Sequence, residues 1–204
     1  MPSLPARTRR RVRLTPDARR QQLVGVAARL LTEQGPAHVQ MTELAEVAGV
    51  TRPVVYRFFP SRVALVESVL ADFTTDLAAR FHDALLRSLG GGLPVVTQAF
   101  VEACCDAITA RGKGAWRLMY ARGADVEAAR LGQAALHRLL APWLPRIAEL
   151  TGQGMRRVEL LAAVVVAAGG AALDGWLDGR IKRSEAVRTA TRSVTALLRE
   201  WATG

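Results

Sequence analysis

Residues 51–57, TRPVVYR, place two guanidinium groups, a phenol and several methyl groups within about two helical turns. At helical spacing, Thr51, Arg52 and Arg57 lie on the exposed side of a helix or at its start. In the major groove an arginine can donate two hydrogen bonds to guanine, and a Val or Thr methyl can contact a thymine methyl. Tyr56 offers a hydroxyl group to a phosphate. The combination favours contact with double-stranded DNA over the alternative of a solvated arginine face.

Two short helices, at 41–48 and 52–59, are predicted to position these side chains. Ala45 provides a small residue where the second helix crosses the first, and Gly49 tolerates the positive φ that a tight turn favours. Thr51 can cap the second helix. The side chains expected to face inward are Leu44, Val47, Val50, Val55 and Phe59.

Helical periodicity continues along the chain. The first helix starts with a capping Thr, a first-turn Pro and an Asp at residues 15–17, and it ends at Gly35-Pro36. A long fourth helix follows Pro60-Ser61 and ends at residues 90–92, which are all Gly. Further helices are predicted at about 94–110, 114–122, 125–150, 155–178 and 182–202, with Pro142 and Pro145 kinking or splitting the third of them. No stretch alternates convincingly with period two, so we expect an all-α fold of about nine helices.

Positive charge is concentrated in the first third of the chain. The formal net charge is +10; residues 1–62 hold 11 Arg and 4 acidic residues, a net of +7, and residues 63–204 hold 17 basic and 14 acidic residues, a net of +3. This asymmetry indicates nucleic acid or another anionic surface as a partner. Residues 1–14 are expected to form a flexible basic arm that reaches DNA, or else a solvated tail. The arm has no apolar segment after its charges, unlike a secretory signal.

Other reactive side chains form no recognisable catalytic or metal-binding pattern. His38, His82 and His137 lack the spacing of metal ligands, and no Gly-rich loop or nucleophile motif follows a strand. We therefore expect no enzyme, no cofactor and no metal. Cys104 and Cys105 are adjacent, which disfavours an unstrained disulfide and favours a reducing, cytoplasmic location.

Residues 16–66 resemble the DNA-binding domain of the TetR family of bacterial transcriptional regulators. The resemblance rests on a first helix followed by AGVTRPVVYRFFPSRVALV, with its Ala-Gly-Val turn, its Tyr before Phe and its small-Ser-basic step into a long helix. Phe58 stands where a His is common, and Arg62, which can neutralise a phosphate, replaces the usual Lys. Gln40 replaces a common capping Thr, so the phosphate contact there would come from Gln40 or Thr42. The predicted DNA-binding residues are Gln40, Thr42, Thr51, Arg52, Pro53, Val54, Tyr56, Arg57 and Arg62.

The chain divides into the flexible arm, a helix-turn-helix domain over 15–60 and a helical ligand-binding and dimerisation domain over 61–204. The apolar run 160–173 is shorter than the roughly 20 residues that span a bilayer, and it predicts a buried core helix. The resemblance implies that the last two helices form the four-helix interface of a homodimer; the alternative buries both within one subunit. The predicted interface residues are Ala163, Ala167, Gly170, Ala171, Val187, Thr191, Val194, Leu198 and Trp201.

The resemblance also implies a pocket for a small-molecule effector among the long fourth helix and the helices after it. Residues that could line it are Phe73, Phe81, Phe100, Cys104, Trp116, Met119, Tyr120, His137, Trp143 and Trp176, although each could instead be ordinary core packing. The predicted function is a repressor released from a palindromic operator by a ligand. The alternatives are a DNA-binding dimer that needs no ligand, and a helical protein at an anionic membrane surface.

Overall fold

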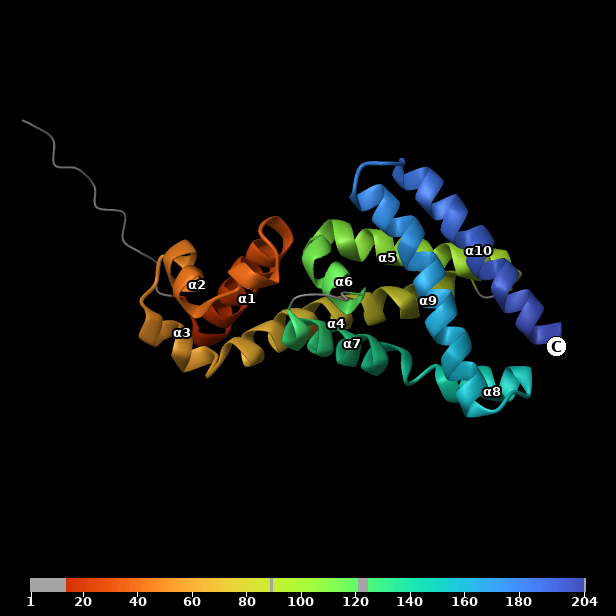
Figure 1. Ribbon diagram of the computed structural model, residues 1–204, viewed down its shortest axis with the longest axis horizontal. Helices are drawn as coiled ribbons and strands as arrows, with labels where there is room; N and C mark the ends of the chain where they lie inside the picture. Colours follow the sequence, from red (N-terminus) through yellow and green to blue (C-terminus); the bar gives the residue numbers. More distant parts are fainter. Residues whose placement is uncertain (1–13, 89, 121–124, 204) are drawn as a thin grey trace, which may run out of the picture.

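Ten α-helices and one 3-10 turn, with no strand, make up the described residues 14–88, 90–120 and 125–203 of the computed structural model (Figure 1). They are α1 (Pro16–Glu33), η1 (Pro36–His38), α2 (Met41–Ala48), α3 (Arg52–Phe58), α4 (Arg62–Ser88), α5 (Leu93–Arg111), α6 (Lys113–Tyr120), α7 (Val126–Leu140), α8 (Leu144–Thr151), α9 (Met155–Leu177) and α10 (Arg183–Thr203). The predicted all-α fold is confirmed. The tenth helix arises because Pro142 and Pro145 split the expected 125–150 helix into α7 and α8.

Helices α1, α2 and α3 form a headpiece, defined as residues 14–60, whose ends follow local sequence signals. The Thr15 hydroxyl accepts a hydrogen bond from the Ala18 amide at 3.2 Å, which caps α1 as predicted. Gly49 ends α2 in the left-handed conformation with φ 64°, and its amide donates to the carbonyls of Ala45 and Glu46. This turn leads directly into α3. The predicted arm falls outside the described residues except for Leu14, which is exposed.

The buried face of α2 consists of Met41, Leu44 and Ala45. Val47 was expected to face inward, but 47% of its surface is exposed. The expectation was wrong because positions 41, 44 and 45 define the inward direction of this helix, and position 47 lies outside that arc. Ala45 is buried, as the crossing of the two short helices requires.

Helix α4 connects the headpiece to the body of the molecule, defined as residues 62–203. The Ser61 hydroxyl accepts a hydrogen bond from the Ala64 amide at 3.2 Å. The helix then runs for 27 residues, about 40 Å at the usual rise, from the headpiece to the far end of α5 (Figure 1). Its buried side chains are Leu65, Val66, Val69, Leu70, Phe73, Leu77, Phe81, Ala84 and Ser88. The buried side of this one continuous helix therefore packs against α1 of the headpiece and against α5, α6 and α7.

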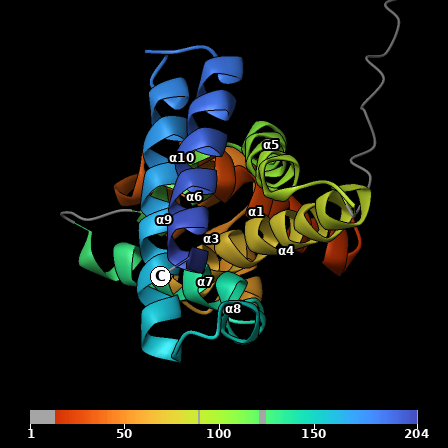
Figure 2. The same ribbon diagram turned by 90° about the vertical axis from the view of Figure 1, so that its right-hand side faces the viewer.

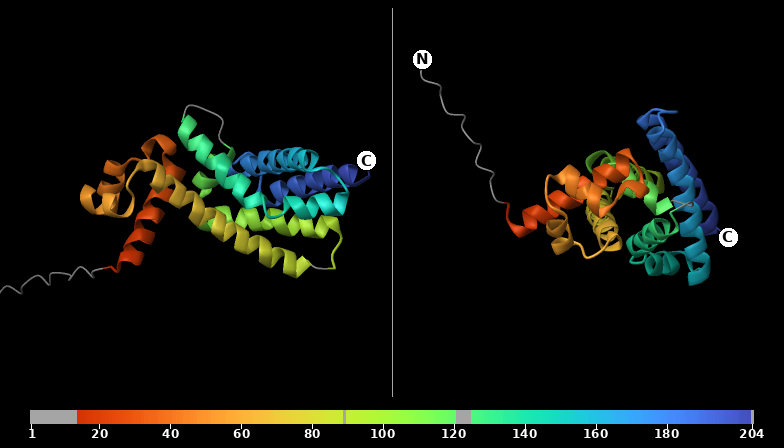
Figure 3. Two further views of the ribbon diagram at one scale, coloured as in Figure 1. Left: turned by 90° about the horizontal axis from the view of Figure 1, so that it is seen from below. Right: turned by 60° about the vertical axis from the view of Figure 1, so that its left-hand side comes forward.

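The other body helices pack in two groups. Helices α5, α6 and α7 contact α4, and α10 lies across α5 and α9. Gly132 on α7 allows a close approach to α6, because a Cβ there would lie 2.0 Å from the Leu118 carbonyl oxygen. Figure 2 shows α9 and α10 side by side, and Figure 3 places them at the opposite end of the molecule from the headpiece.

Helices α5 and α9 are long and apolar enough to cross a membrane by length and composition alone. The whole of α9 is 23 residues long, so the length argument made for 160–173 does not hold for the helix. Only 28% of its most apolar window is buried inside the subunit. The expectation of a buried core helix was therefore wrong for one face of α9, where Ala163, Val164 and Ala167 are exposed.

Candidate nucleic-acid interface

The outward face of α3 carries the side chains predicted to contact DNA. Arg52, Tyr56 and Arg57 are exposed, and 46% of the Tyr56 surface is accessible. On the opposite side of the helix, Val55 and Phe59 are 0% and 1% exposed. The buried pair anchors α3 to the headpiece core, so the polar side chains face away from the protein.

The first turns of α2 and α3 hold the remaining predicted contacts on the headpiece. Thr51 and Pro53 are exposed and Val54 is half-buried. Thr51 occupies the N-cap position of α3 but makes no capping hydrogen bond, which differs from the prediction. Thr42 is exposed in the first turn of α2. The Gln40 amide nitrogen donates to a backbone carbonyl of η1 at 3.0 Å, so this side chain packs beside the start of α2 without capping it.

The electrostatics of α3 favour an anionic partner. The helix contains two arginines and no acidic residue. Among the described residues, neither Arg52 nor Arg57 belongs to an ion pair. The acidic Glu43 of α2 instead lies 3.4 Å from a ring nitrogen of His38. The two guanidinium groups of α3 are therefore available to phosphates or base edges.

Arg62 does not have the environment predicted for a phosphate contact. Its guanidinium donates to the carbonyl oxygens of Pro36 at 2.8 Å and Val39 at 3.1 Å. It also pairs with Asp125 at 2.5 Å and lies 3.5 Å from a carboxylate oxygen of Glu127. The phosphate contact of Arg62 stays a prediction, and tertiary packing surrounds its guanidinium with acceptors that are distant in sequence. Asp125 was not among the predicted site residues, and nothing in the sequence marks it as the partner of Arg62.

The pKa of Asp125 lies below its ordinary value. The hydrogen bond from the Ala128 amide lowers it most, burial opposes this effect, and the neighbouring Arg62 guanidinium lowers it further. Asp125 is therefore ionised throughout the neutral range, and its pair with Arg62 joins the start of α4 to the start of α7.

The predicted dimer residues separate into two groups. Ala163, Ala167 and Ala171 of α9 are exposed and form a stripe of small side chains. Gly170, Val187 and Val194 are instead buried within the subunit, and Thr191, Leu198 and Trp201 are half-buried. A Cβ at Gly170 would lie 3.1 Å from the Tyr120 ring, and α10 packs on α9 and α5. For these three residues the alternative of burial within one subunit is correct.

Exposed apolar residues that the prediction omitted extend the α9 stripe. Met155, Leu160 and Val164 are exposed, with 58% of the Leu160 surface accessible. Leu160 and Val164 precede Ala163 and Ala167 by three residues each, so they share the same side of the helix. Their apolar character and helical spacing were the signals that could have identified them.

The predicted pocket residues form aromatic contacts within the body. The ring centroids of Phe81 and Phe100 are 4.8 Å apart, and those of Phe100 and Trp143 are 5.7 Å apart. A second pair joins Trp116 to Tyr120 at 4.8 Å. Phe73 and Met119 are also buried, and Cys104 and Trp176 are half-buried. His137 is exposed, so among the predicted pocket residues it is not part of the buried aromatic cluster.

Polar atoms accompany the second aromatic pair. The indole nitrogen of Trp116 and one carboxylate oxygen of Asp174 are buried without a hydrogen bond of normal geometry among the described residues, although the indole lies close enough to lower the pKa of Asp174. Burial raises the pKa of Asp174, an effect that the nearby Arg117 partly offsets. Burial also raises the pKa of Tyr120. This part of the body therefore combines aromatic surface with polar groups that could receive a ligand.

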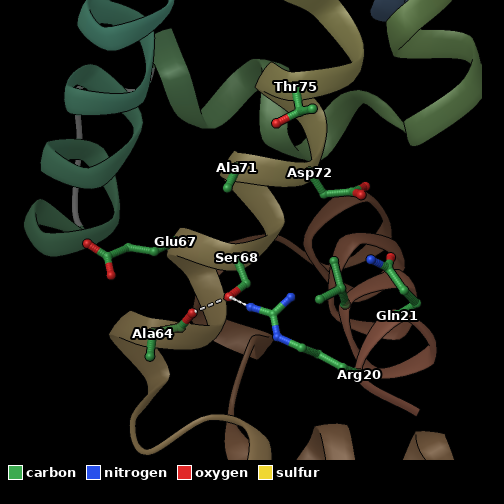
Figure 4. A pocket seen from close by; sticks show the side chains of 9 residues that line it. Arg20, Gln21, Ala64, Glu67, Ser68, Ala71, Asp72 and Thr75 are labelled. Carbon is green, nitrogen blue, oxygen red and sulfur yellow. Dashed lines mark hydrogen bonds between the residues drawn. The ribbon is translucent and has the colours of Figure 1, made fainter. Parts of the chain in front are cut away.

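A cavity of about 520 Å³ lies between α1 and α4 and is bordered by none of the ten predicted pocket residues. Figure 4 shows Arg20 reaching from α1 to Ser68 on α4, where its guanidinium donates to the hydroxyl at 3.0 Å. Asp72 also borders the cavity and pairs with Arg111 at 2.8 Å. The cavity is open to solvent, and its lining combines charged and polar side chains with apolar surface.

Burial raises the pKa of both Cys104 and Cys105. For Cys105 the Arg183 side chain opposes this effect, a basic neighbour that the sequence did not reveal. A raised pKa lowers the thiolate fraction at neutral pH and therefore the reactivity toward oxidants. Within the described ranges, no group of three or more His, Cys, Asp or Glu side chains is placed to hold a metal ion.

Comparison with known proteins agrees with this geometry. Residues 23–69 match the model of the family described as "Bacterial regulatory proteins, tetR family". The chain is 33% identical over 112 residues to the HTH-type transcriptional activator FasR of Mycolicibacterium smegmatis, covering 55% of this chain and 50% of FasR. It is 31% identical over 111 residues to the HTH-type transcriptional regulator TtgR of Pseudomonas putida, covering 50% of each chain. The chain thus spans about half the length of the curated relatives it matches.

A solved structure extends the likeness to most of the chain. A tetR-family transcriptional regulator from Streptomyces coelicolor superposes with a TM-score of 0.67 at 28% identity, covering 93% of this chain and 84% of that one. The chain therefore resembles the tetR family of bacterial regulatory proteins, in residues 23–69 by the family model and in the succession of its helices by the solved structure.

Proposed function

We propose that this chain is a DNA-binding transcriptional regulator whose headpiece reads an operator through α3. The observation that carries the proposal is the two-sided character of that helix. Val55 and Phe59 fix it to the core, while Arg52, Tyr56 and Arg57 face outward. A helix with this arrangement fits the major groove of B-form DNA.

Each headpiece residue has a role that follows from its chemistry. Arg52 and Arg57 bond to guanine, and the methyl groups of Thr51 and Val54 contact thymine. Tyr56 donates its hydroxyl to a phosphate. Three further contacts come from the helix starts, where Gln40 and Thr42 approach phosphates and Pro53 holds the first turn of α3 against the backbone.

We propose that two copies pair through α9, because one helix-turn-helix reads only a few base pairs. The exposed stripe of Ala163, Ala167 and Ala171 allows two helices to approach closely, and Leu160 and Val164 supply apolar surface beside it. The pair would present its two headpieces to successive major grooves, with half-site centres about 34–36 Å apart. Repression of transcription is a simpler outcome than activation, because a dimer that occupies its operator needs no contact with another protein to repress.

A small molecule that binds in the body would regulate this DNA binding. The aromatic contacts of Phe81, Phe100 and Trp143, and the polar atoms of Trp116 and Asp174, support a body site for such an effector. Helix α4 packs against α1 of the headpiece at its start and against the other body helices along its length. Displacement of α4 would therefore change the separation of the two α3 helices in a dimer. The coupling between two such sites commonly corresponds to about 1–3 kcal/mol.

Selection of bound fragments from random duplex DNA tests the proposal with the full chain. We expect enrichment of a palindromic site whose half-sites are about one helical turn apart. Failure to enrich any sequence, or retention on anionic vesicles without retention of DNA, would contradict the proposal.

A thermal-shift screen of small apolar compounds then tests the effector. A true ligand raises the melting temperature with its concentration, and we expect it to lower the affinity for the selected operator. A screen of this chemistry without any stabilising compound would favour the alternative of a DNA-binding dimer that acts without a ligand.

A further inference from the structure

Arg62 joins three segments that are far apart in sequence. It is the first residue of α4, and its Nε atom donates to the Val39 carbonyl while Nη2 donates to the Pro36 carbonyl. Pro36 and Val39 belong to the short connection that sets where α2 begins. The same Nη2 atom bonds to Asp125, which stands before α7 in the body.

Asp125 is shared between the two sides of this junction. One of its carboxylate oxygens accepts the Ala128 amide at 2.9 Å and caps α7, and the other accepts the Arg62 guanidinium. The side chains of Arg62 and Asp125 are 19% and 25% exposed, whereas that of Glu127 is 50% exposed. The Arg62–Asp125 pair is therefore the sheltered contact, and Glu127 lies at its rim.

We propose that Arg62 is a positioning residue, which holds the segment before α2 in register with the start of α7 and so determines how the headpiece is presented to the operator. The inference rests on the proposed DNA-binding function and concerns its regulation. Displacement of α7 would leave a sheltered guanidinium without its ionised partner. The headpiece and α7 are therefore favoured to move together.

The same geometry opposes a direct role in phosphate binding. Two carbonyl oxygens and two carboxylates surround the Arg62 guanidinium. A phosphate approaching it would meet the negative charges of Asp125 and Glu127. Arg52 and Arg57, which belong to no ion pair within the described residues, provide the cations for that purpose.

The test is operator affinity across a salt series for Asp125→Asn, Arg62→Ala and the double variant. Asparagine retains the cap for α7 but removes the charge facing Arg62. We expect each single variant to weaken operator binding about five-fold or more, because the headpiece loses its preferred orientation. The double variant should be no weaker than the poorer single one, since both remove the same contact. The slope of log affinity against log salt should stay at the wild-type value.

Two further variants, Arg62→Lys and Glu127→Gln, test whether the shape of the guanidinium and the exposed carboxylate matter for operator binding. Lysine keeps the charge but lacks the planar fork that reaches carbonyls and carboxylate together, so we expect it to resemble Arg62→Ala. Glu127→Gln alters only the exposed carboxylate and should bind like the wild type. Amide exchange of residues 37–41 should become faster in Asp125→Asn and stay unchanged in Glu127→Gln.

Three outcomes would overturn the inference. The first is a shallower salt slope in Arg62→Ala, by about one phosphate contact, with wild-type binding in Asp125→Asn; this would make Arg62 a phosphate ligand. The second is a lowered melting temperature in Asp125→Asn with wild-type affinity and exchange, which would make the pair purely stabilising. The third is full binding by Arg62→Lys. Absence of any operator for the wild-type chain would instead refute the proposed function itself.

Discussion

At the scale of single residues, exposure separates the side chains of α3 that we propose to contact DNA from those that anchor the helix to the headpiece core. Arg52 and Arg57 have similar chemistry to Arg62, yet only the first two face away from the protein without a carboxylate partner among the described residues. Charge alone therefore does not identify a DNA contact in this chain. The neighbours of each guanidinium decide its role.

Arg52→Ala is expected to relax base preference. Loss of a bidentate contact to guanine reduces discrimination at one position by about 1–3 kcal/mol. The measurement compares affinities for the selected operator and its single-base variants. Arg138→Ala, at an exposed position on α7, should leave the preference unchanged. Equal discrimination by Arg52→Ala and the wild type would exclude base contact by this residue.

Gly49→Ala is expected to destabilise the headpiece. Its φ of 64° lies in the left-handed region, which costs an ordinary residue about 1–2 kcal/mol. Gly25→Ala is the matched control, because it lies within α1 and its added Cβ would have no atom within 4 Å. There alanine should stabilise by about 0.5–1 kcal/mol. Chemical denaturation of both variants gives the difference, and a stabilised Gly49→Ala would show that the turn is not left-handed.

At the scale of elements, ion pairs join helices at several places along α4. Asp76 pairs with Arg80 on its own helix at 2.7 Å and with Arg111 of α5 at 3.5 Å. Burial opposes its ionisation, but the hydrogen bonds and charges of these two arginines together lower the pKa of Asp76. The long helix is thereby tied to α5 as well as to the headpiece.

Stability should depend on pH through Asp76. A carboxyl whose pKa is lower in the folded state adds stability above its unfolded pKa and loses it as pH falls through the folded value. Asp76→Asn should therefore lower the free energy of unfolding at pH 7 by up to about 1 kcal/mol, given solvent screening. The difference from the wild type should shrink as pH falls below the ordinary pKa of aspartate and vanish below the lowered pKa of folded Asp76.

Asp83→Asn, at an exposed position further along α4, serves as the control for thermal unfolding measured as a function of pH. If Asp76→Asn and the wild type differ by the same amount at acid and neutral pH, the stabilisation does not come from the ionised carboxylate.

At the scale of the whole molecule, α9 and α10 lie at the end opposite the headpiece (Figure 3). Only 28% of the most apolar window of α9 is buried within the subunit, and Leu160, Ala163, Val164 and Ala167 are exposed. Exposed apolar stripes of this kind mark interaction surfaces. Association through this face would leave both headpieces free for DNA.

Ala167→Arg is expected to convert a dimer into a monomer. A long charged side chain in the middle of the small-residue stripe prevents close helix approach and places an unpaired charge in the contact. Ala134→Arg, at an exposed position on α7, should not alter assembly. Sedimentation velocity gives the mass of each variant. A dimer that persists in Ala167→Arg would place the interface elsewhere.

Local signals in the sequence determined the helices and the recognition face. Capping by Thr15, the small Ala45 and the turn at Gly49 act over a few residues, so their effect can be read from neighbours along the chain. The alternation of buried and exposed residues in α3 follows from helical periodicity for the same reason. Pro142, between α7 and α8, and Pro145, in the first turn of α8, likewise interrupt the helix through their own backbone geometry.

Only the tertiary structure decided which groups meet across the molecule. Arg62 and Asp125 are 63 positions apart, and nothing in the sequence indicates their contact, which joins the start of α4 to the start of α7. Val187 and Val194 face the subunit interior because α10 packs on α5 and α9. Their apolar character alone is compatible with a dimer interface or with burial within one subunit. Periodicity tells which side of a helix is apolar, but the helix that covers that side is selected by packing of the whole chain.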